Sequence, residues 1–140
     1  MDLETVSAAG FGRSLTGLGL NLVVRDVRRL AAFLEAVFEM RAHRLSADFA
    51  IMTYHGTPFQ LHADATFARH PLLSLLPEAG ARGAGLEIRL YETDPDAAAR
   101  RAAAFAEATI LQPPADKPHG LRECCILCAD GYAWVPSRRL

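Results

Sequence analysis

Residues 86–96, with the sequence LEIRLYETDPD, decide the fold of this chain. From Leu86 to Tyr91, apolar side chains alternate strictly with charged or polar ones, which is the pattern of a β-strand with one buried face. Asp94 followed by Pro95 then provides a helix cap and a first helical residue. The stretch predicts a strand that leads directly into a helix, and that helix is expected to run to about Ala108.

The same arrangement occurs earlier in the chain. A shift of 68 residues places Asp26 on Asp94 and keeps the apolar positions of both strands and both helices in phase. Residues 19–25 predict the earlier strand, and apolar residues at helical spacing predict a helix that ends near Met40. The repeat indicates a duplicated strand–helix unit.

Short β-forming segments, separated by turn residues, follow each strand–helix pair. They lie at about residues 41–45, 49–54 and 59–63 in the first half, and at 109–111, 121–127 and 132–135 in the second. Residues 1–16 show no sustained periodicity and predict a loosely attached tail, while the segment between the halves predicts a linker with one helical turn. We therefore expect one domain, residues 17–140, made of two modules at 17–64 and 84–136.

Composition excludes several classes of protein. The 140 residues are 51% hydrophobic, which suits one globular domain, and the net charge of −1 lacks the basic surplus of a nucleic-acid-binding protein. No apolar run reaches the roughly 20 residues of a membrane span, and the N-terminus lacks the basic start of a signal peptide. Cys124, Cys125 and Cys128 are too crowded for a disulfide framework and predict buried free thiols. These features predict a soluble cytoplasmic protein with no nucleic-acid or membrane partner.

Two segments near the C-terminus carry a family resemblance. Gly120-Leu121-Arg122-Glu123 begins a strand, and the hairpin at residues 130–134 reads DGYAW, although Cys128-Ala129 stands where Asp-Pro is usual. With the order of elements over residues 17–136, the chain resembles the vicinal oxygen chelate superfamily, which includes glyoxalase I, bleomycin-resistance proteins, extradiol dioxygenases and fosfomycin-resistance proteins. The resemblance implies an α+β fold in which two βαβββ modules form a curved mixed sheet around a cleft, commonly in a homodimer.

Strand alternation predicts which side chains line that cleft. In the fold that the resemblance implies, the helix of each module packs on the convex face of the sheet, and the concave face lines the pocket. The predicted ligand-binding side chains are Asn21, Gln60, His62, Glu87, Arg89 and Tyr91. Two interpretations of Arg89 stay open: it recognises an anionic group of the ligand, or it forms a structural ion pair with a cross-strand partner.

The resemblance also implies four positions at which metal-dependent members hold a divalent ion. These positions are Gly19, Gln60, Glu87 and Val135. Glycine and valine have no coordinating side chain, and a divalent site normally needs at least three protein ligands. His62 and Asn21 are the nearest substitutes, but each lies two residues along its strand, roughly 7 Å away. The sequence therefore favours no metal cofactor, and a divalent ion is the alternative.

Three functions are compatible with these residues. The favoured hypothesis is a metal-free small-molecule-binding protein of the bleomycin-resistance kind, which sequesters an antibiotic-like or other polar ligand. The alternative is a metal-dependent lyase, isomerase or dioxygenase with Glu87 as metal ligand and base. The third is metal-free acid–base catalysis by Glu87, His62 or Tyr91. His119 is predicted to be a solvated loop residue, and whether the protein is an enzyme stays open.

Overall fold

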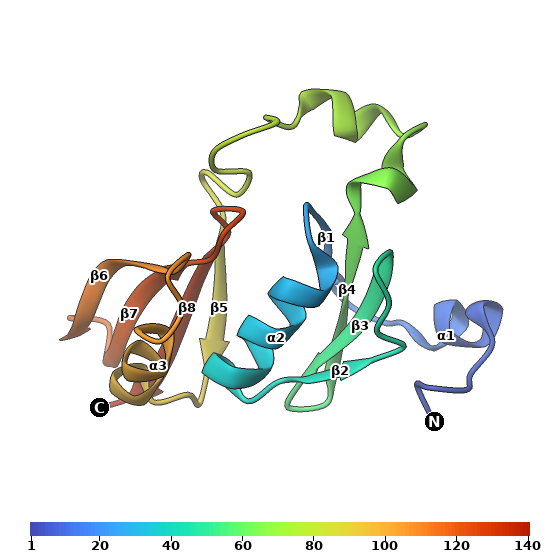
Figure 1. Ribbon diagram of the computed structural model, residues 1–140. Coiled ribbons are helices and arrows are strands. Elements are labelled where there is room, and N and C mark those ends of the chain that lie inside the picture. Colours follow the sequence, from blue (N-terminus) through green and yellow to red (C-terminus); the bar gives the residue numbers. More distant parts are fainter. The chain divides into compact units, whose positions relative to one another are not determined.

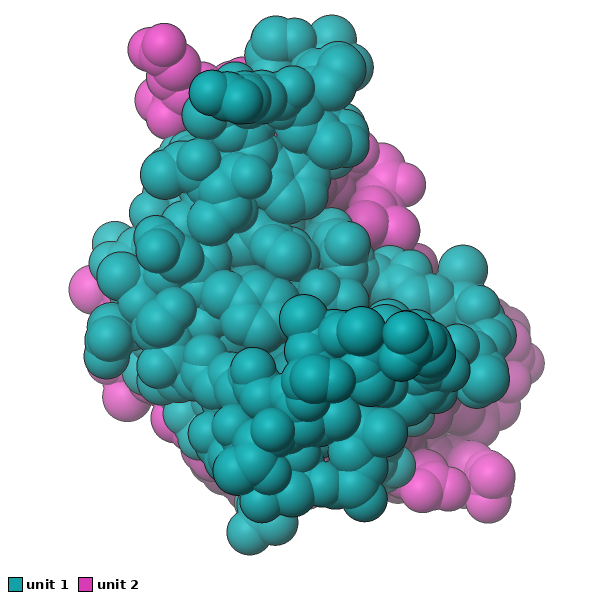
Figure 2. All heavy atoms as spheres, turned by 90° about the vertical axis from the view of Figure 1, so that its right-hand side faces the viewer, with its two compact units in different colours: residues 1–35, 39–75 teal, residues 36–38, 76–140 magenta.

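Two four-stranded sheets form the framework of the chain, one in each half of the sequence (Figure 1). The computed structural model describes residues 1–140. It divides into unit 1, residues 1–35 and 39–75, and unit 2, residues 36–38 and 76–140 (Figure 2). Each unit is a mixed sheet with helices, so the predicted α+β class with two modules is confirmed. No helix has the length and apolar character required to span a bilayer.

Unit 1 contains the sheet β1–β4–β3–β2. The strands are β1 (Asn21–Val24), β2 (Arg41–His43), β3 (Phe49–Tyr54) and β4 (Thr57–Ala63), with β1 parallel to β4 and the other pairs antiparallel. β4 begins earlier than predicted because the connecting turn contains only His55 and Gly56. Both residues have positive φ, 47° and 81°, which suits a tight hairpin.

Helix α2 (Val27–Phe38) connects β1 to β2. The Asp26 carboxylate accepts a hydrogen bond from the backbone N–H of Arg29 at 3.0 Å, so the predicted cap is confirmed. The helix ends at Phe38, before Met40, because Glu39 adopts the left-handed conformation with φ 58°. After β4, two short 3₁₀ helices, Asp64–Phe67 and Pro71–Leu75, replace the single helical turn that the sequence predicts.

A short helix that the sequence does not predict, α1 (Ala8–Ser14), lies in the N-terminal segment. The Ser7 hydroxyl caps it by accepting from the backbone N–H of Gly10 at 3.0 Å. Phe11 is buried, and the Arg44 guanidinium donates hydrogen bonds to the carbonyl oxygens of Leu3, at 2.9 Å, and Val6. A segment expected to be a loose tail is thus anchored to unit 1 by one apolar and several polar contacts.

Unit 2 contains the sheet β5–β8–β7–β6. Its strands are β5 (Glu87–Tyr91), β6 (Thr109–Asp116), β7 (Leu121–Leu127) and β8 (Ala133–Arg139), with β5 parallel to β8 and the other pairs antiparallel. β6 is longer than predicted because an edge strand tolerates Pro113 and Pro114, and register shifts between Ile110 and Ala115 absorb them. β8 likewise extends beyond the predicted end at Val135.

Helix α3 (Pro95–Ala102) packs against β6, β7 and β8 (Figure 1). It is shorter than predicted, because residues 103–108 continue in tight turns, such as the one closed by Phe105 N–H on the Ala102 carbonyl at 3.0 Å. Arg122 on β7 holds the helix by donating to both carboxylate oxygens of Asp96, at 2.7 and 2.9 Å. The opposite face of the sheet carries Glu87, Arg89 and Tyr91.

Candidate functional site

A cavity of about 670 Å³ lies in unit 1 beside the start of β1. Its wall consists of Phe11, residues 14–21 and residues 56–60, so it lies between the N-terminal segment, β1 and the turn that precedes β4. Asn21 and Gln60 line it, as does the predicted family position Gly19. None of the lining residues is charged, and none is histidine or cysteine. The cavity can therefore bind a molecule through shape and neutral hydrogen bonds.

The strand register explains why Asn21 and Gln60 share this wall. The two residues are direct partners in the parallel pair of β1 and β4, so their side chains lie on the same face of the sheet. Ile51 is the partner of Gln60 on β3 and continues the row. Asn21 is exposed and Gln60 is half-buried, so the amide of Asn21 has free hydrogen-bonding capacity toward the cavity.

His62 lies one row further along the sheet and does not line the cavity. A ring nitrogen, Nε2, lies 3.1 Å from the Gln60 Oε1, and the ring packs between Phe49 and Phe67 with centroid separations of 5.2 and 5.3 Å. Burial lowers the pKa of His62 below its ordinary value, so the ring is neutral near pH 7. In this arrangement His62 orients the Gln60 amide.

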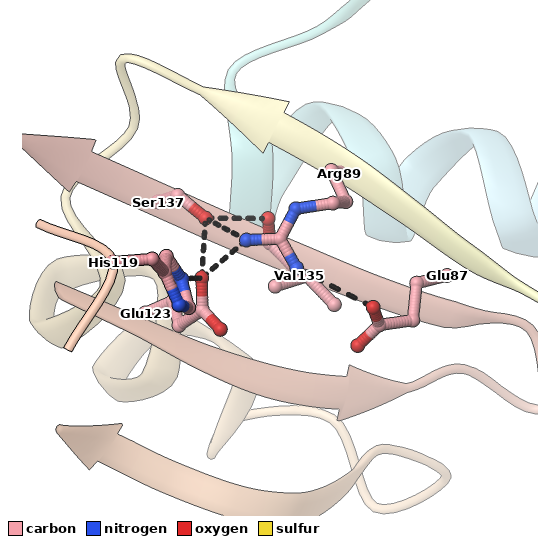
Figure 3. Close-up of polar contacts among 6 residues, drawn as sticks. All are labelled: Glu87, Arg89, His119, Glu123, Val135 and Ser137. Carbon is pink, nitrogen blue, oxygen red and sulfur yellow. Dashed lines mark hydrogen bonds and ion pairs between the residues drawn. The ribbon is translucent and has the colours of Figure 1, made fainter. Parts of the chain in front are cut away.

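In unit 2, Glu87, Arg89 and Tyr91 share one face of β5, as the alternation predicts. Figure 3 shows Glu87 and Arg89 on this face. The Arg89 guanidinium pairs with Glu123 on β7 and, at 3.4 Å, with Glu87 on its own strand. It also lies 5.7 Å from the centre of the Tyr91 ring. The structure thus favours the ion-pair interpretation of Arg89, whose charge is balanced by carboxylates of the protein itself.

Glu123 and His119 are members of this cluster that sequence reasoning did not select. The side chain of Glu123 is only 11% exposed, and its Oε2 accepts from Arg89, while His119 Nε2 lies 3.2 Å away (Figure 3). Burial raises the pKa of Glu123, but hydrogen bonds and charges from Arg89 and His119 outweigh it, and the net pKa is below the ordinary value. Alternation along β7 could have identified Glu123. Arg122 lies on the face of the sheet that contacts α3, so the next residue, Glu123, lies on the other face.

The cysteines follow their prediction. All are free and buried, and Cys124 and Cys125 project to opposite faces of β7. The Cys124 thiol contacts the Pro95 carbonyl oxygen of α3 at 3.6 Å, and burial raises its pKa to about 12. A thiol with such a pKa carries almost no thiolate at pH 7, so it is a structural residue.

The donor set does not fit a divalent metal centre of the family type. At the implied positions, Gly19 has no side chain and Val135 is apolar and buried. The Gln60 carbonyl oxygen contacts His62, and the Glu87 carboxylate pairs with the guanidinium of Arg89. No group of three or more histidine, cysteine, aspartate or glutamate side chains is placed to hold a metal ion.

Comparison with known proteins supports the fold. No protein-family model and no curated protein sequence matches the chain. A glyoxalase/bleomycin resistance protein/dioxygenase family enzyme from Burkholderia phytofirmans PsJN superposes with a TM-score of 0.71 at 16% identity, covering 86% of this chain and 96% of its own. TioX from Micromonospora sp. ML1 gives 0.63 at 23% identity, with 89% and 99% covered.

The fosfomycin resistance protein FosX from Mesorhizobium loti gives a TM-score of 0.63 at 18% identity, with 90% of this chain and 94% of FosX covered. Each of these matches covers 86–90% of the chain, more than either unit alone contains. The chain therefore has the same fold as these glyoxalase/bleomycin-resistance-type proteins.

Proposed function

We propose that this protein binds a small, uncharged polar molecule in the cavity of unit 1 and needs no metal ion to do so. The observation that carries the proposal is the lining of the cavity. It contains the family positions Gly19 and Gln60 but no carboxylate, imidazole or thiol, so any ligand must be held by amides, hydroxyls, backbone groups and apolar contacts. A volume of about 670 Å³ is within the range of small-molecule sites.

The polar face of unit 2 supports a binding role over metal chemistry. Glu87 is the family position best suited to bind a cation, yet its carboxylate faces the Arg89 guanidinium at 3.4 Å. A metal ion at Glu87 would be repelled by that arginine. The exposed parts of this face, namely Glu87, Tyr91 and His119, offer hydrogen-bonding groups and one aromatic ring to a ligand.

We further propose that the protein acts as a cytoplasmic homodimer, the assembly that the family resemblance implies. Three buried free thiols support a reducing compartment. Light scattering coupled to size-exclusion chromatography gives the mass in solution. A mass of one chain, near 15.2 kDa, at micromolar concentration would contradict the homodimer.

The binding proposal is tested by a screen of neutral fragments with ligand-observed NMR on protein treated with a chelator. Gly19→Leu places a side chain on the cavity wall, at a position where an added Cβ would meet no atom within 4 Å and φ is not positive. We expect hits to bind at least tenfold more weakly to Gly19→Leu and normally to Ala104→Leu, an exposed control in unit 2. Fragments that bind Gly19→Leu as tightly as the wild-type protein, or that bind only when a divalent ion is present, would contradict the proposal.

Metal-free acid–base catalysis is the second candidate, and the His119–Glu123 pair favours it. A buried carboxylate that contacts Nε2 of a half-exposed histidine orients the imidazole and leaves Nδ1 for proton transfer. Turnover of any bound fragment that depends on pH and is lost in His119→Gln would support this function. Binding of fragments without any turnover would contradict catalysis and leave ligand binding as the function.

A further inference from the structure

A second, smaller cavity of about 290 Å³ lies under helix α1 in unit 1. Its wall is mostly apolar and includes Val6 and Ala8 from the N-terminal segment and Phe49 and Ile51 from β3. The one charged lining residue, Arg44, uses its guanidinium to donate to the carbonyl oxygens of Leu3 and Val6. A dry apolar cavity of about half this volume is able to bind benzene, so the space suits an aromatic or branched aliphatic group.

The two cavities adjoin each other. Phe11, Leu15 and Gln60 line both, so the two spaces share one stretch of wall. The larger cavity is lined by neutral polar and apolar residues, whereas the smaller one is mostly apolar. A single molecule that occupies both cavities would contact polar groups in one and apolar groups in the other.

We propose that the ligand of unit 1 is an uncharged amide that carries an aromatic or branched apolar group. The amide part binds in the larger cavity, where the side-chain amides of Asn21 and Gln60 donate and accept hydrogen bonds as a peptide group requires. The apolar group enters the smaller cavity beneath α1, next to Ile51. This inference rests on the binding function proposed above and adds the chemical class of the ligand.

The structure provides a matched pair of variants that separate the two cavities. Gly12 lines only the smaller cavity and Gly19 only the larger one. A Cβ at either glycine would meet no atom within 4 Å, and neither has a positive φ, so each accepts a side chain without backbone strain. Gly12→Leu and Gly19→Leu therefore each place a side chain on the wall of one cavity, and thermal melting checks that both variants fold.

The probes are N-acetyl-phenylalaninamide and N-acetyl-alaninamide, which differ only in the apolar group. Dissociation constants come from chemical-shift titration of the whole chain. The expected result is at least tenfold tighter binding of the phenylalanine amide to the wild-type protein. Gly12→Leu should remove this preference and leave binding of the alanine amide unchanged, whereas Gly19→Leu should weaken binding of both amides.

Equal affinity for the two amides, or a preference that survives in Gly12→Leu, would overturn the inference. Failure of both amides to bind, while neutral fragments still bind and lose affinity in Gly19→Leu, would also overturn it and leave the proposed function standing. If no neutral fragment is sensitive to Gly19→Leu, the proposed function itself fails.

Discussion

Arg89 and Glu123 form an ion pair although they lie on strands that are not neighbours in the sheet. Arg89 is on β5 and Glu123 on β7, with β8 between them. Ser137 of β8 is the register partner of Glu123, and its hydroxyl lies 3.5 Å from both the guanidinium and the carboxylate (Figure 3). The pair therefore links three strands of unit 2 on one face.

Removing one member of this pair should destabilise the protein. We expect Glu123→Gln to lower the free energy of unfolding by about 2 kcal/mol, because it leaves a partly buried guanidinium without its main carboxylate. Urea unfolding measures the change. Glu87→Gln, which breaks the exposed pair with the same arginine, serves as control and should cost at most about 0.5 kcal/mol. Equal losses of unfolding free energy in the two variants would show that the burial of Glu123 does not strengthen its pair with Arg89.

The same pair predicts acid sensitivity. The pKa of Glu123 is lowered in the folded protein, because Arg89 and His119 outweigh the effect of burial. Its contribution is therefore fully present above the ordinary glutamate pKa of about 4.3, and it is lost as the pH falls through the folded-state pKa. Unfolding measured at several pH values below 5 should show a steeper loss of stability in wild-type protein than in Glu123→Gln. If the stability of the two proteins falls equally with pH, Glu123 is not the source of the acid sensitivity.

His62 predicts a second, separate pH dependence. Burial lowers its pKa in the folded state, so the unfolded chain binds the proton more readily. The contribution is complete above the ordinary histidine pKa of about 6.5, and stability falls as the pH drops from there toward the folded-state pKa. His62→Asn should flatten the stability curve just below pH 6.5. An unchanged slope in His62→Asn would show that His62 is not the group responsible.

Metal removal should have no effect on stability or on fragment binding. A divalent ion present at 100 times its dissociation constant would stabilise the folded state by about 2.7 kcal/mol. We expect neither a chelator nor added Mn²⁺ or Zn²⁺ to shift the melting temperature of the wild-type protein. A stabilising shift that disappears in Glu87→Ala would instead place a metal at that carboxylate and make a metal-dependent lyase or dioxygenase the leading function.

The N-terminal segment should loosen when its polar anchor is removed. The Arg44 guanidinium donates to Leu3 and Val6, and the Arg44 backbone N–H donates to the Glu4 carboxylate. We expect Arg44→Met to accelerate hydrogen exchange of the Phe11 amide by about tenfold or more; this amide donates to the carbonyl oxygen of Ser7, the cap residue of α1. In Arg44→Met, the amides of α2 should exchange at the wild-type rate. Arg41→Met, a substitution of an exposed arginine, is the control, and in it the Phe11 amide should also exchange at the wild-type rate. Unchanged exchange at Phe11 would show that its buried ring alone holds the segment.

Much of the fold and part of the candidate site are determined by the sequence alone. The strand at residues 87–91, the cap at Asp26 and the opposite faces of Cys124 and Cys125 follow from local rules, namely a two-residue alternation and a side chain that bonds to a nearby backbone N–H. The weakness of the metal positions also follows locally, because glycine and valine have no coordinating atom wherever they lie.

Tertiary structure decided the rest. Helix α1 is too short for a detectable period, and it is held by Arg44, which follows Leu3 by 41 positions in the sequence. The Arg89–Glu123 pair spans 34 positions and depends on the register of β5, β8 and β7. Alternation tells which face a side chain occupies, but only strand pairing tells which distant residue it meets there. The two cavities and the charge balance of Arg89 are therefore properties of the folded chain.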